Sequence, residues 1–400
     1  MKKIIVIGAF GCGNQGDDAI LEGITRNLED EFEIIPTIGK YDSIKNGYKR
    51  YLSCRLCEGI SVPVIFNMIL FVISYIFTVI RSSAVIIGGG QLIHELTSYN
   101  LKFYFLLQKI AEIFGKKVYY FGIGAGPFKT KKASDRLALC MNRCGGVYTR
   151  TPGDAGLLTD IGVKKVKASA DIVFSFENNA QKGDRLRTNG ARHKTNSARH
   201  QLITGGYIIV NICKWFHSDN IFRQDSMDFR TEKKLFCDSA RILHEMTGKQ
   251  IALLPTVACD EPVAAEIAEM LKAEGMEDVC ALSAAMSCDD TANIIAGSYM
   301  VLGTRMHSLI FAAKNGVPFI AAIYDPKVNF YLSFIEMDKS GIEISALASD
   351  RFKELAALTI KKHDEISSHL LNQAERLREI VSSDFVDLKK KIDSTQKIYE

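Results

Sequence analysis

Three side chains in the last third of the chain have the types and spacing needed to hold and protonate a small anion. In "LGTRMHSLIFAAKNGVPFIAAIYDPKV" (residues 302–328), Arg305 and His307 open an expected helix, and Lys327 follows the next expected strand. The carboxyl ends of adjacent parallel strands are where such folds bind ligands. A guanidinium and an ammonium bind anions, and a histidine exchanges protons near neutral pH. We therefore predict an anion site with an acid–base group, with a structural role for His307 as the alternative.

A glycine-rich turn near the start carries a second group of polar residues. The letters "GCGNQG" (residues 11–16) fit the dinucleotide fingerprint G-x-G-x-x-G. Three features count against a dinucleotide. Gly8 already ends the expected strand, and Asp17 and Asp18 occupy the helix start, where a pyrophosphate needs positive potential. In addition, the second strand is followed by no acid placed for a ribose hydroxyl.

Two further expected strands of the first half also end in glycine turns. The triple glycine 88–90 follows "AVII", and the spaced glycines 122–126 follow "KVYYF". Glycine tolerates a left-handed backbone and close approach, so these turns serve either tight packing or the approach of a bulky polar ligand. Polar side chains beside them offer hydrogen bonds to sugar hydroxyls. We predict an acceptor-sugar site made of Asn14, Asp17, Gly89, Gly90 and Gln91.

The composition excludes several classes of protein. The 400 residues are 47% apolar, enough for two domain cores, and the net charge of +4 gives no reason to expect nucleic acid. The short apolar run after Met1 ends in glycines and aspartates, which predicts a first strand rather than a signal peptide. Ten cysteines then indicate reduced thiols. No second C-x-x-C joins Cys54-x-x-Cys57, so we predict no metal.

The elements that must position these residues alternate as short strands and amphipathic helices. We predict strands near 3–7, 32–36, 84–88, 117–121, 146–149 and 172–175, then near 207–213, 250–254, 279–282, 299–302 and 319–323. This alternation is typical of parallel βαβ units. We therefore predict an α/β protein with two doubly wound Rossmann-like domains facing a cleft. The expected segments are an acceptor-side domain 1–176, a basic flexible linker 177–206, a donor-side domain 207–345 and C-terminal helices 346–400.

One expected helix is unusually apolar. Residues 60–80 carry no charge, and Val64–Ile80 reaches the lower limit of about 17 residues for a membrane span. A span there would put strands 3–7 and 84–88, which should share a sheet, on opposite sides of a bilayer. A helix on a sheet needs only one apolar stripe. The additional apolar surface of this helix must therefore be buried against something else. The candidates are a membrane interface, a partner subunit or the C-terminal helices of the chain itself.

Six stretches stand in an order that resembles a known family. They are "GAFGCGNQGDDAIL", "VIIGGGQLIHE", "YFGIGAGP", "VYTRTPGDAGLLTDIGV", "SADIVFSF" and "GTRMHSLIFAAKNGVPFIAAIYDPKV". Together they resemble the polysaccharide pyruvyl transferase family over most of residues 1–335, and the last stretch is the most specific. The basic insert 177–206 and the apolar helix 60–80 depart from the family pattern.

The resemblance implies two Rossmann-like domains in a glycosyltransferase-B-like arrangement. It also implies transfer of a pyruvyl group from phosphoenolpyruvate to a sugar of a cell-surface polysaccharide or its lipid-linked precursor, which forms a pyruvate ketal. By the same resemblance His307 is the general acid, and Arg305, Lys327 and Arg150 are cations that bind the donor. Phosphoenolpyruvate is then a co-substrate, and no cofactor is expected. We expect a cytoplasmic protein, either free or peripheral on the inner face of the cytoplasmic membrane through Val64–Ile80, whose other partner is the glycan or lipid-linked oligosaccharide.

Two other functions stay open on the sequence. A nucleotide-sugar-dependent glycosyltransferase of the same architecture would bind a nucleoside diphosphate, whereas the phosphoenolpyruvate hypothesis predicts no such binding. A non-catalytic protein would use the apolar helix and the basic segment for attachment to a membrane or a partner.

Overall fold

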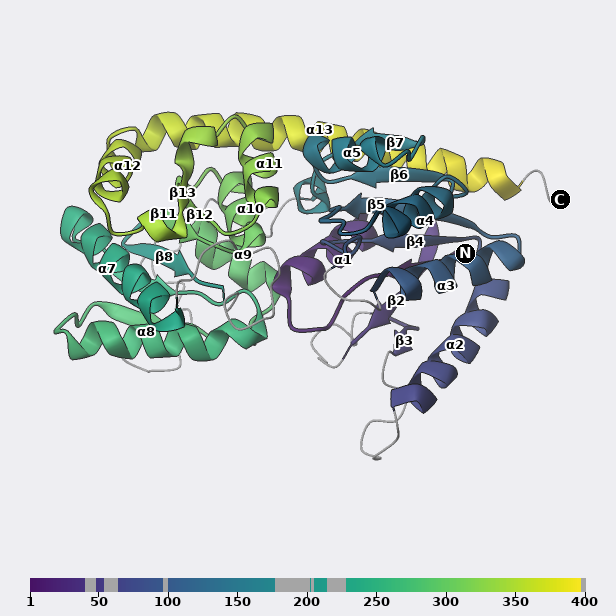
Figure 1. Ribbon diagram of the computed structural model, residues 1–400, viewed down its shortest axis with the longest axis horizontal. Coiled ribbons are helices and arrows are strands. Elements are labelled where there is room, and N and C mark those ends of the chain that lie inside the picture. Colours follow the sequence, from purple (N-terminus) through teal and green to yellow (C-terminus); the bar gives the residue numbers. More distant parts are fainter. Residues whose placement is uncertain are drawn as a thin grey trace. The chain divides into compact units, whose positions relative to one another are not determined.

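The computed structural model describes residues 1–39, 48–53, 64–95, 100–176, 202, 205–213 and 228–396 (Figure 1). Contacts divide the chain into two compact units. Unit 1 consists of Met1–Phe176 with Leu377–Glu400, and unit 2 of Glu177–Arg376. Each unit contains one parallel sheet flanked by helices. The prediction of an α/β protein with two Rossmann-like domains is confirmed, while their placement across a cleft stays a prediction.

Unit 1 has a seven-stranded parallel sheet in the order β3-β2-β1-β4-β5-β6-β7. The strands are β1 (Lys2–Ile7), β2 (Phe32–Ile38), β3 (Leu52–Ser53), β4 (Ala84–Gly88), β5 (Lys117–Ile123), β6 (Gly146–Thr149) and β7 (Val166–Ala168). Its helices are α1 (Gln15–Leu28), α2 (Val64–Ile80), α3 (Asn100–Ile113), α4 (Lys131–Met141), α5 (Pro152–Asp160) and the 3₁₀ helix η2 (Ile172–Ser175). The strand order reverses between β1 and β4, and ligands bind at such a switch point in doubly wound folds.

The strand expected at 172–175 is wrong, because these residues form η2. The Asp171 side chain accepts a hydrogen bond from the Val173 N–H at 3.0 Å, which caps a turn where a strand would continue extended. Ile172, Val173 and Phe174 are all buried. A run that is buried on every side looks the same in the sequence whether it is a strand or a short helix.

Unit 2 has a six-stranded parallel sheet in the order β10-β9-β8-β11-β12-β13. The strands are β8 (Tyr207–Asn211), β9 (Gln250–Leu253), β10 (Val279–Ala281), β11 (Met300–Gly303), β12 (Phe319–Ile323) and β13 (Gly341–Glu343). The helices are α7 (Phe229–Thr247), α8 (Glu261–Ala273), α9 (Cys288–Ala296), α10 (Met306–Lys314), α11 (Pro326–Phe334) and α12 (Asp350–Lys361), with 3₁₀ helices η4 (Ala258–Asp260), η5 (Asp338–Ser340) and η6 (Ile344–Ala346). The switch point of this sheet lies between β8 and β11.

The last helix, α13 (His363–Gln396), contributes to both units. In unit 2, Arg376 donates from Nη2 to the Phe334 carbonyl at 2.5 Å. In unit 1, the ring of Phe385 lies 4.7 Å from that of Phe121 between centroids. The expected separate group of helices at 346–400 is therefore divided between the units. Apart from 202, 205 and 206, the predicted linker 177–206 lies outside the described residues.

Two further expectations concern metals and membranes. Within the described ranges, no group of three or more His, Cys, Asp or Glu side chains is arranged to hold a metal ion. Cys54 and Cys57 lie outside those ranges. In the same part of the chain, no helix combines the length and the apolar character that crossing a membrane requires.

Candidate active site

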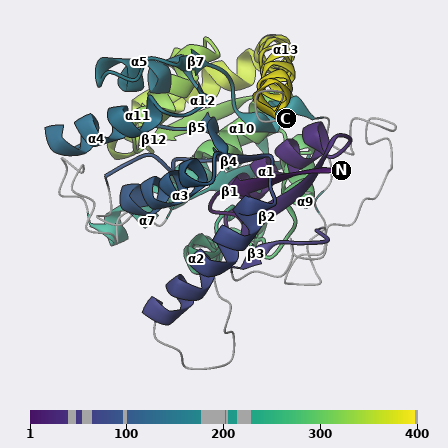
Figure 2. The same cartoon turned by 90° about the vertical axis from the view of Figure 1, so that its right-hand side faces the viewer.

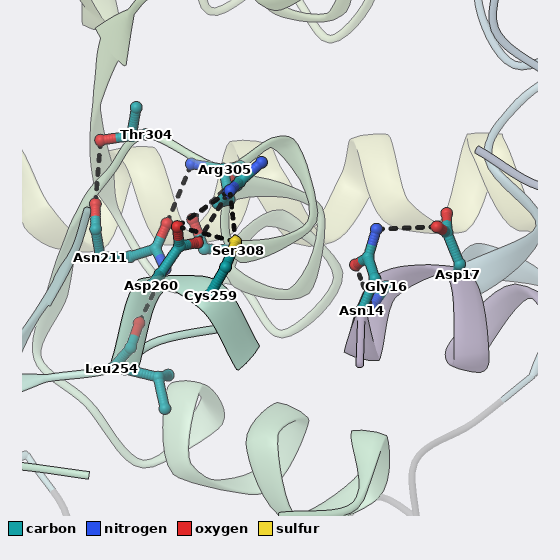
Figure 3. A network of polar contacts seen from close by, with 10 residues as sticks. All are labelled: Asn14, Gly16, Asp17, Asn211, Leu254, Cys259, Asp260, Thr304, Arg305 and Ser308. Carbon is teal, nitrogen blue, oxygen red and sulfur yellow. Dashed lines mark hydrogen bonds and ion pairs between the residues drawn. The ribbon is translucent and has the colours of Figure 1, made fainter. Parts of the chain in front are cut away.

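Arg305 lies at the switch point of unit 2 and is held rigidly there. It follows β11 as the N-cap residue of α10, and its backbone N–H donates to Asn211 Oδ1 at 2.9 Å, at the end of β8. Its guanidinium binds Asp260 with two hydrogen bonds, from Nε at 2.8 Å and from Nη2 at 2.9 Å (Figure 3). Asp260 is fully buried. A bidentate pair of this kind fixes the plane of the guanidinium.

Buried hydrogen bonds tie the strand ends around Arg305 together. Asn211 donates from Nδ2 to the Leu254 carbonyl at 2.7 Å, and Thr304 donates from Oγ1 to the Asn211 carbonyl at 3.0 Å (Figure 3). Ser308 Oγ donates to the Arg305 carbonyl at 2.7 Å. The ends of β8, β9 and β11 are thus locked to one another. Neither Asn211, which ends β8, nor Asp260, which ends η4 directly before α8, was predicted from the sequence.

Lys327 lies in the first turn of α11, after the neighbouring strand β12. Its Nζ lies 3.7 Å from Asp325 Oδ2 and 4.9 Å from the centroid of the Tyr324 ring. Burial raises the pKa of Tyr324, and Lys327 and Arg305 both act in the opposite direction. Burial likewise raises the pKa of Cys213, again opposed by the two cations. The charges of Arg305 and Lys327 therefore both act on Tyr324 and Cys213.

His307 is the second residue of α10 and is 8% exposed. Its ring lies 6.5 Å from the Phe311 ring between centroids, one helical turn further on. Arg305, two residues earlier, is the N-cap residue and has an extended backbone. The N-terminus of α10 adds backbone N–H groups and positive potential, which favour an anion.

The switch point of unit 1 holds the residues predicted for an acceptor. Asn14 is the N-cap of α1, where its Oδ1 accepts from the Gly16 N–H at 3.1 Å and its Nδ2 donates to Asp17 Oδ2 at 2.7 Å (Figure 3). Gly90, after β4, has φ +66°, and a Cβ there would lie 2.3 Å from Asp17 Oδ1. Only glycine lets this carboxylate lie against the backbone. Gly89 also has a left-handed backbone, with φ +88°.

The carboxyls of Asp17, which is buried, and Asp18, which is half-buried, both have raised pKa values. Burial, followed by the charge of Asp18, raises the pKa of Asp17 to about 7, and Arg150 opposes this shift. Burial raises the pKa of Asp18 to about 6, although the Gly11 N–H donates to its Oδ1 at 2.8 Å. Perturbed carboxyl groups at a ligand-binding edge are candidates for proton transfer.

Arg150 lies with the predicted acceptor residues of unit 1, whereas Arg305 and Lys327 belong to unit 2. It is 3% exposed, donates from Nη2 to Gln91 Oε1 at 3.2 Å, and has Nε 3.7 Å from Asp154 Oδ2. Gln91 in turn donates to the Gly126 carbonyl at 2.5 Å. Arg150 thus connects the turns after β4, β5 and β6. The sequence analysis missed Asp154, whose Oδ1 accepts from the Ala125 N–H at 2.9 Å.

The family model described as polysaccharide pyruvyl transferase matches residues 14–326 of this chain. The chain belongs to the polysaccharide pyruvyl transferase family. The match begins at Asn14 and spans both switch points, so it includes every predicted site residue except Lys327. No curated protein matches the sequence.

Several solved structures have a similar fold. S. aureus MnaA with UDP gives a TM-score of 0.58 at 12% identity, over 99% of this chain and 98% of that chain. The UDP-GlcNAc 2-epimerase from Neisseria meningitidis bound to UDP-GlcNAc gives 0.56 at 11%, over 95% and 99%. Acinetobacter baumannii MurG gives 0.51 at 11%, over 99% and 100%. At these identities the likeness shows the fold, which is that of the GT-B enzymes.

Proposed function

We propose that this polysaccharide pyruvyl transferase moves a pyruvyl group from phosphoenolpyruvate to a sugar of a cell-surface polysaccharide or of its lipid-linked precursor, which forms a ketal. The observation that carries the proposal is the pair of cations at the carboxyl ends of β11 and β12. Phosphoenolpyruvate carries a phosphate and a carboxylate, so two cations at adjacent strand ends, beside a helix N-terminus, match its charges.

Arg305 is suited to bind one of these anionic groups. The hydrogen bonds that its guanidinium makes within the described residues fall on Nε and Nη2, which leaves Nη1 for the donor. Asp260 orients the group, and the side chain of Arg305 is 21% exposed while that of Asp260 is fully buried. Lys327, held over the ring of Tyr324, supplies the second charge and stabilises the departing phosphate.

The chemistry needs one proton donor and two attacking hydroxyls. A proton delivered to C3 of phosphoenolpyruvate makes a methyl group and leaves C2 electrophilic. A sugar hydroxyl then attacks C2 and loses its proton, and phosphate leaves. A second hydroxyl closes the ring, so phosphoenolpyruvate and a diol give a ketal and inorganic phosphate. We assign the first proton to His307, because an imidazole is the side chain best suited to donate a proton near neutral pH.

We place the acceptor sugar at the switch point of unit 1, on Asn14, Asp17, Gly89, Gly90 and Gln91. The glycine turns bring backbone close to a ligand. The carboxyl of Asp17, with a pKa of about 7, matches the acidity needed to accept a proton from a hydroxyl.

A solvent-deuterium experiment tests this scheme. The reaction is run in D₂O with purified lipid-linked glycan acceptor, and the product is examined by NMR. We expect one deuterium in the ketal methyl group and one phosphate released per ketal. A product that contains no deuterium, or that forms without phosphate release, would contradict protonation at C3.

A nucleotide-sugar-dependent glycosyltransferase is the second candidate, because two of the similar structures are described with UDP or UDP-GlcNAc. It predicts that a nucleoside diphosphate binds this chain and that phosphoenolpyruvate does not. The two candidates therefore give opposite binding results.

A further inference from the structure

Helix α2 of unit 1 is apolar on the side that faces away from the sheet. It packs inward through Phe71, Tyr75 and Val79, and the Tyr75 hydroxyl donates to the Leu107 carbonyl at 3.0 Å. At about 100° per residue, a second stripe lies on the opposite side of the helix. Its side chains are between 46% and 58% exposed, and they are Phe66, Ile69, Ile73, Phe77 and Ile80.

Cations gather beside the second half of this stripe. A cavity of about 630 Å³ is lined by Ser74, Phe77 and Thr78 of α2 and by four basic side chains, Lys3, Lys49, Arg50 and Arg81. Among the described residues that line this cavity, none is acidic. Glu33 pairs with Arg50, whose Nε lies 3.5 Å from its carboxylate. Arg81 directly follows the helix, and its Nη1 donates to the Phe77 carbonyl at 3.1 Å.

The neighbouring helix α3 also exposes apolar and basic side chains. It packs beside α2, where the rings of Phe71 and Phe103 lie 5.7 Å apart between centroids. Lys102, Leu106, Lys109 and Ile113 recur at helical spacing on its outer side, and all four are exposed. Figures 1 and 2 show α2 on the outside of unit 1. Apolar and basic side chains thus alternate along the outer side of α3.

We propose that the α2 surface, defined as the stripe Phe66, Ile69, Ile73, Phe77 and Ile80 with the cations Lys3, Lys49 and Arg81, docks unit 1 on an anionic lipid bilayer. An apolar stripe inserts into the boundary between headgroups and acyl chains, while adjacent cations contact lipid phosphates. This inference does not depend on the proposed function.

The helix lies in the plane of the membrane. The stripe on its opposite side is buried in the core of unit 1. The 17 residues of α2 also give a length of only about 25 Å, which is shorter than the roughly 30 Å of a bilayer core. Strand β1 precedes α2 in the sequence and β4 follows it, and the two pair directly, with Ile4 opposite Ala84. They therefore stay on one side of the bilayer.

Charge distinguishes a membrane from a second copy of the chain. A two-fold pairing through this surface would place like cations of the two copies near one another. An anionic bilayer instead neutralises them. The chemistry of the surface therefore favours lipid over self-association.

Sedimentation of the full-length protein with vesicles tests the proposal. We expect binding to vesicles of phosphatidylcholine with phosphatidylglycerol, weaker binding to phosphatidylcholine alone, and loss of the difference at high salt. The double variant Ile73→Glu/Phe77→Glu should lower binding by about tenfold or more. Lys49→Glu/Arg81→Glu should remove the preference for the anionic vesicles.

A matched control is Leu358→Glu, which places the same charge at a 44% exposed leucine of α12 in unit 2. It should bind vesicles as the wild type does, and all variants should keep the wild-type melting temperature. The proposal is overturned if the wild type ignores anionic vesicles or if Ile73→Glu/Phe77→Glu binds them normally. It is also overturned if these substitutions instead abolish a concentration-dependent dimer, because the surface would then bind a second copy.

Discussion

His307 is the residue on which the proposed chemistry depends most. His307→Gln keeps a similar size and hydrogen-bonding capacity but cannot exchange a proton near neutral pH. We predict that turnover falls by roughly 10²-fold or more, the usual effect of losing a positioned acid, while phosphoenolpyruvate still binds. Phosphate release and calorimetry measure the two effects. Near wild-type turnover would mean that His307, which is 8% exposed beside Phe311, has a structural role.

Arg305 is proposed to bind the donor in an orientation fixed by Asp260. Arg305→Lys keeps the positive charge but cannot reproduce two hydrogen bonds to one carboxylate. We predict that the affinity for phosphoenolpyruvate falls about tenfold or more, which corresponds to about 1.4 kcal/mol or more. Lys272→Arg, on a half-exposed lysine of α8, is a control of the same chemical type that should bind normally. Unchanged affinity in Arg305→Lys would exclude a bidentate role.

Asp17 makes the stability of unit 1 depend on pH. Its pKa is about 7 in the folded protein, above the ordinary value of 3.8, so its protonated form stabilises the fold. That contribution is fully present below about pH 4 and is lost as the pH rises through 7. Asp17→Asn stays neutral, so we predict a gain on the order of 1–4 kcal/mol over the wild type at pH 8 and none at pH 4. Urea unfolding at both pH values measures this gain in stability. Equal stability of the wild type and Asp17→Asn at pH 8 would contradict the argument that burial raises the pKa of Asp17.

At the scale of elements, the glycine turn after β4 holds the Asp17 carboxylate. Gly90→Ala puts a Cβ 2.3 Å from Asp17 Oδ1 at a backbone φ of +66°. Gly115 has a similar φ of +69° with open space around its Cβ position. We predict that Gly115→Ala costs about 1–2 kcal/mol for backbone strain, and that Gly90→Ala costs about 2 kcal/mol more because a buried side chain must move. Thermal unfolding of the two variants measures these losses of stability. Equal losses would mean that the Asp17 side chain moves aside at no energetic cost.

Most helices and strands could be predicted because short local patterns of residues determine them. Alternating apolar runs and glycine turns placed the longer strands within a residue or two. Three strands, β3, β7 and β13, were missed because Leu52–Ser53, Val166–Ala168 and Gly341–Glu343 are short and carry little periodicity. The pattern of α2 could not show which side packs, since the helix is apolar on two opposite sides. Phe71 and Phe77 look alike in the sequence, yet the first is buried and the second exposed.

From the sequence, the candidate site could be predicted only as a set of suitable residue types that follow the ends of strands. The pairing of Arg305 with Asp260 joins residues 45 positions apart, and the contact of Gly90 with Asp17 joins two different turns. Such partners depend on the strand order of each sheet, which local patterns do not contain. The same reason explains why Arg150 was grouped with cations of the other unit.

At the scale of the whole molecule, α13 contributes core residues to both units. Phe385, 2% exposed, packs on Phe121 of unit 1, while the adjacent Val386 is 51% exposed. We predict that Phe385→Ala costs about 3–5 kcal/mol and that Val386→Ala costs less than about 0.5 kcal/mol. Urea denaturation measures both. A small loss in Phe385→Ala would mean that unit 1 is stable without the end of α13.

The central claim is that the donor is phosphoenolpyruvate, and calorimetric titration of the full-length protein tests it most directly. Titrations with phosphoenolpyruvate and with UDP are compared for the wild type and for Lys327→Ala. The proposal predicts that phosphoenolpyruvate binds the wild type, that Lys327→Ala weakens this binding, and that UDP does not bind. Binding of UDP without binding of phosphoenolpyruvate would contradict the claim and favour a nucleotide-sugar donor.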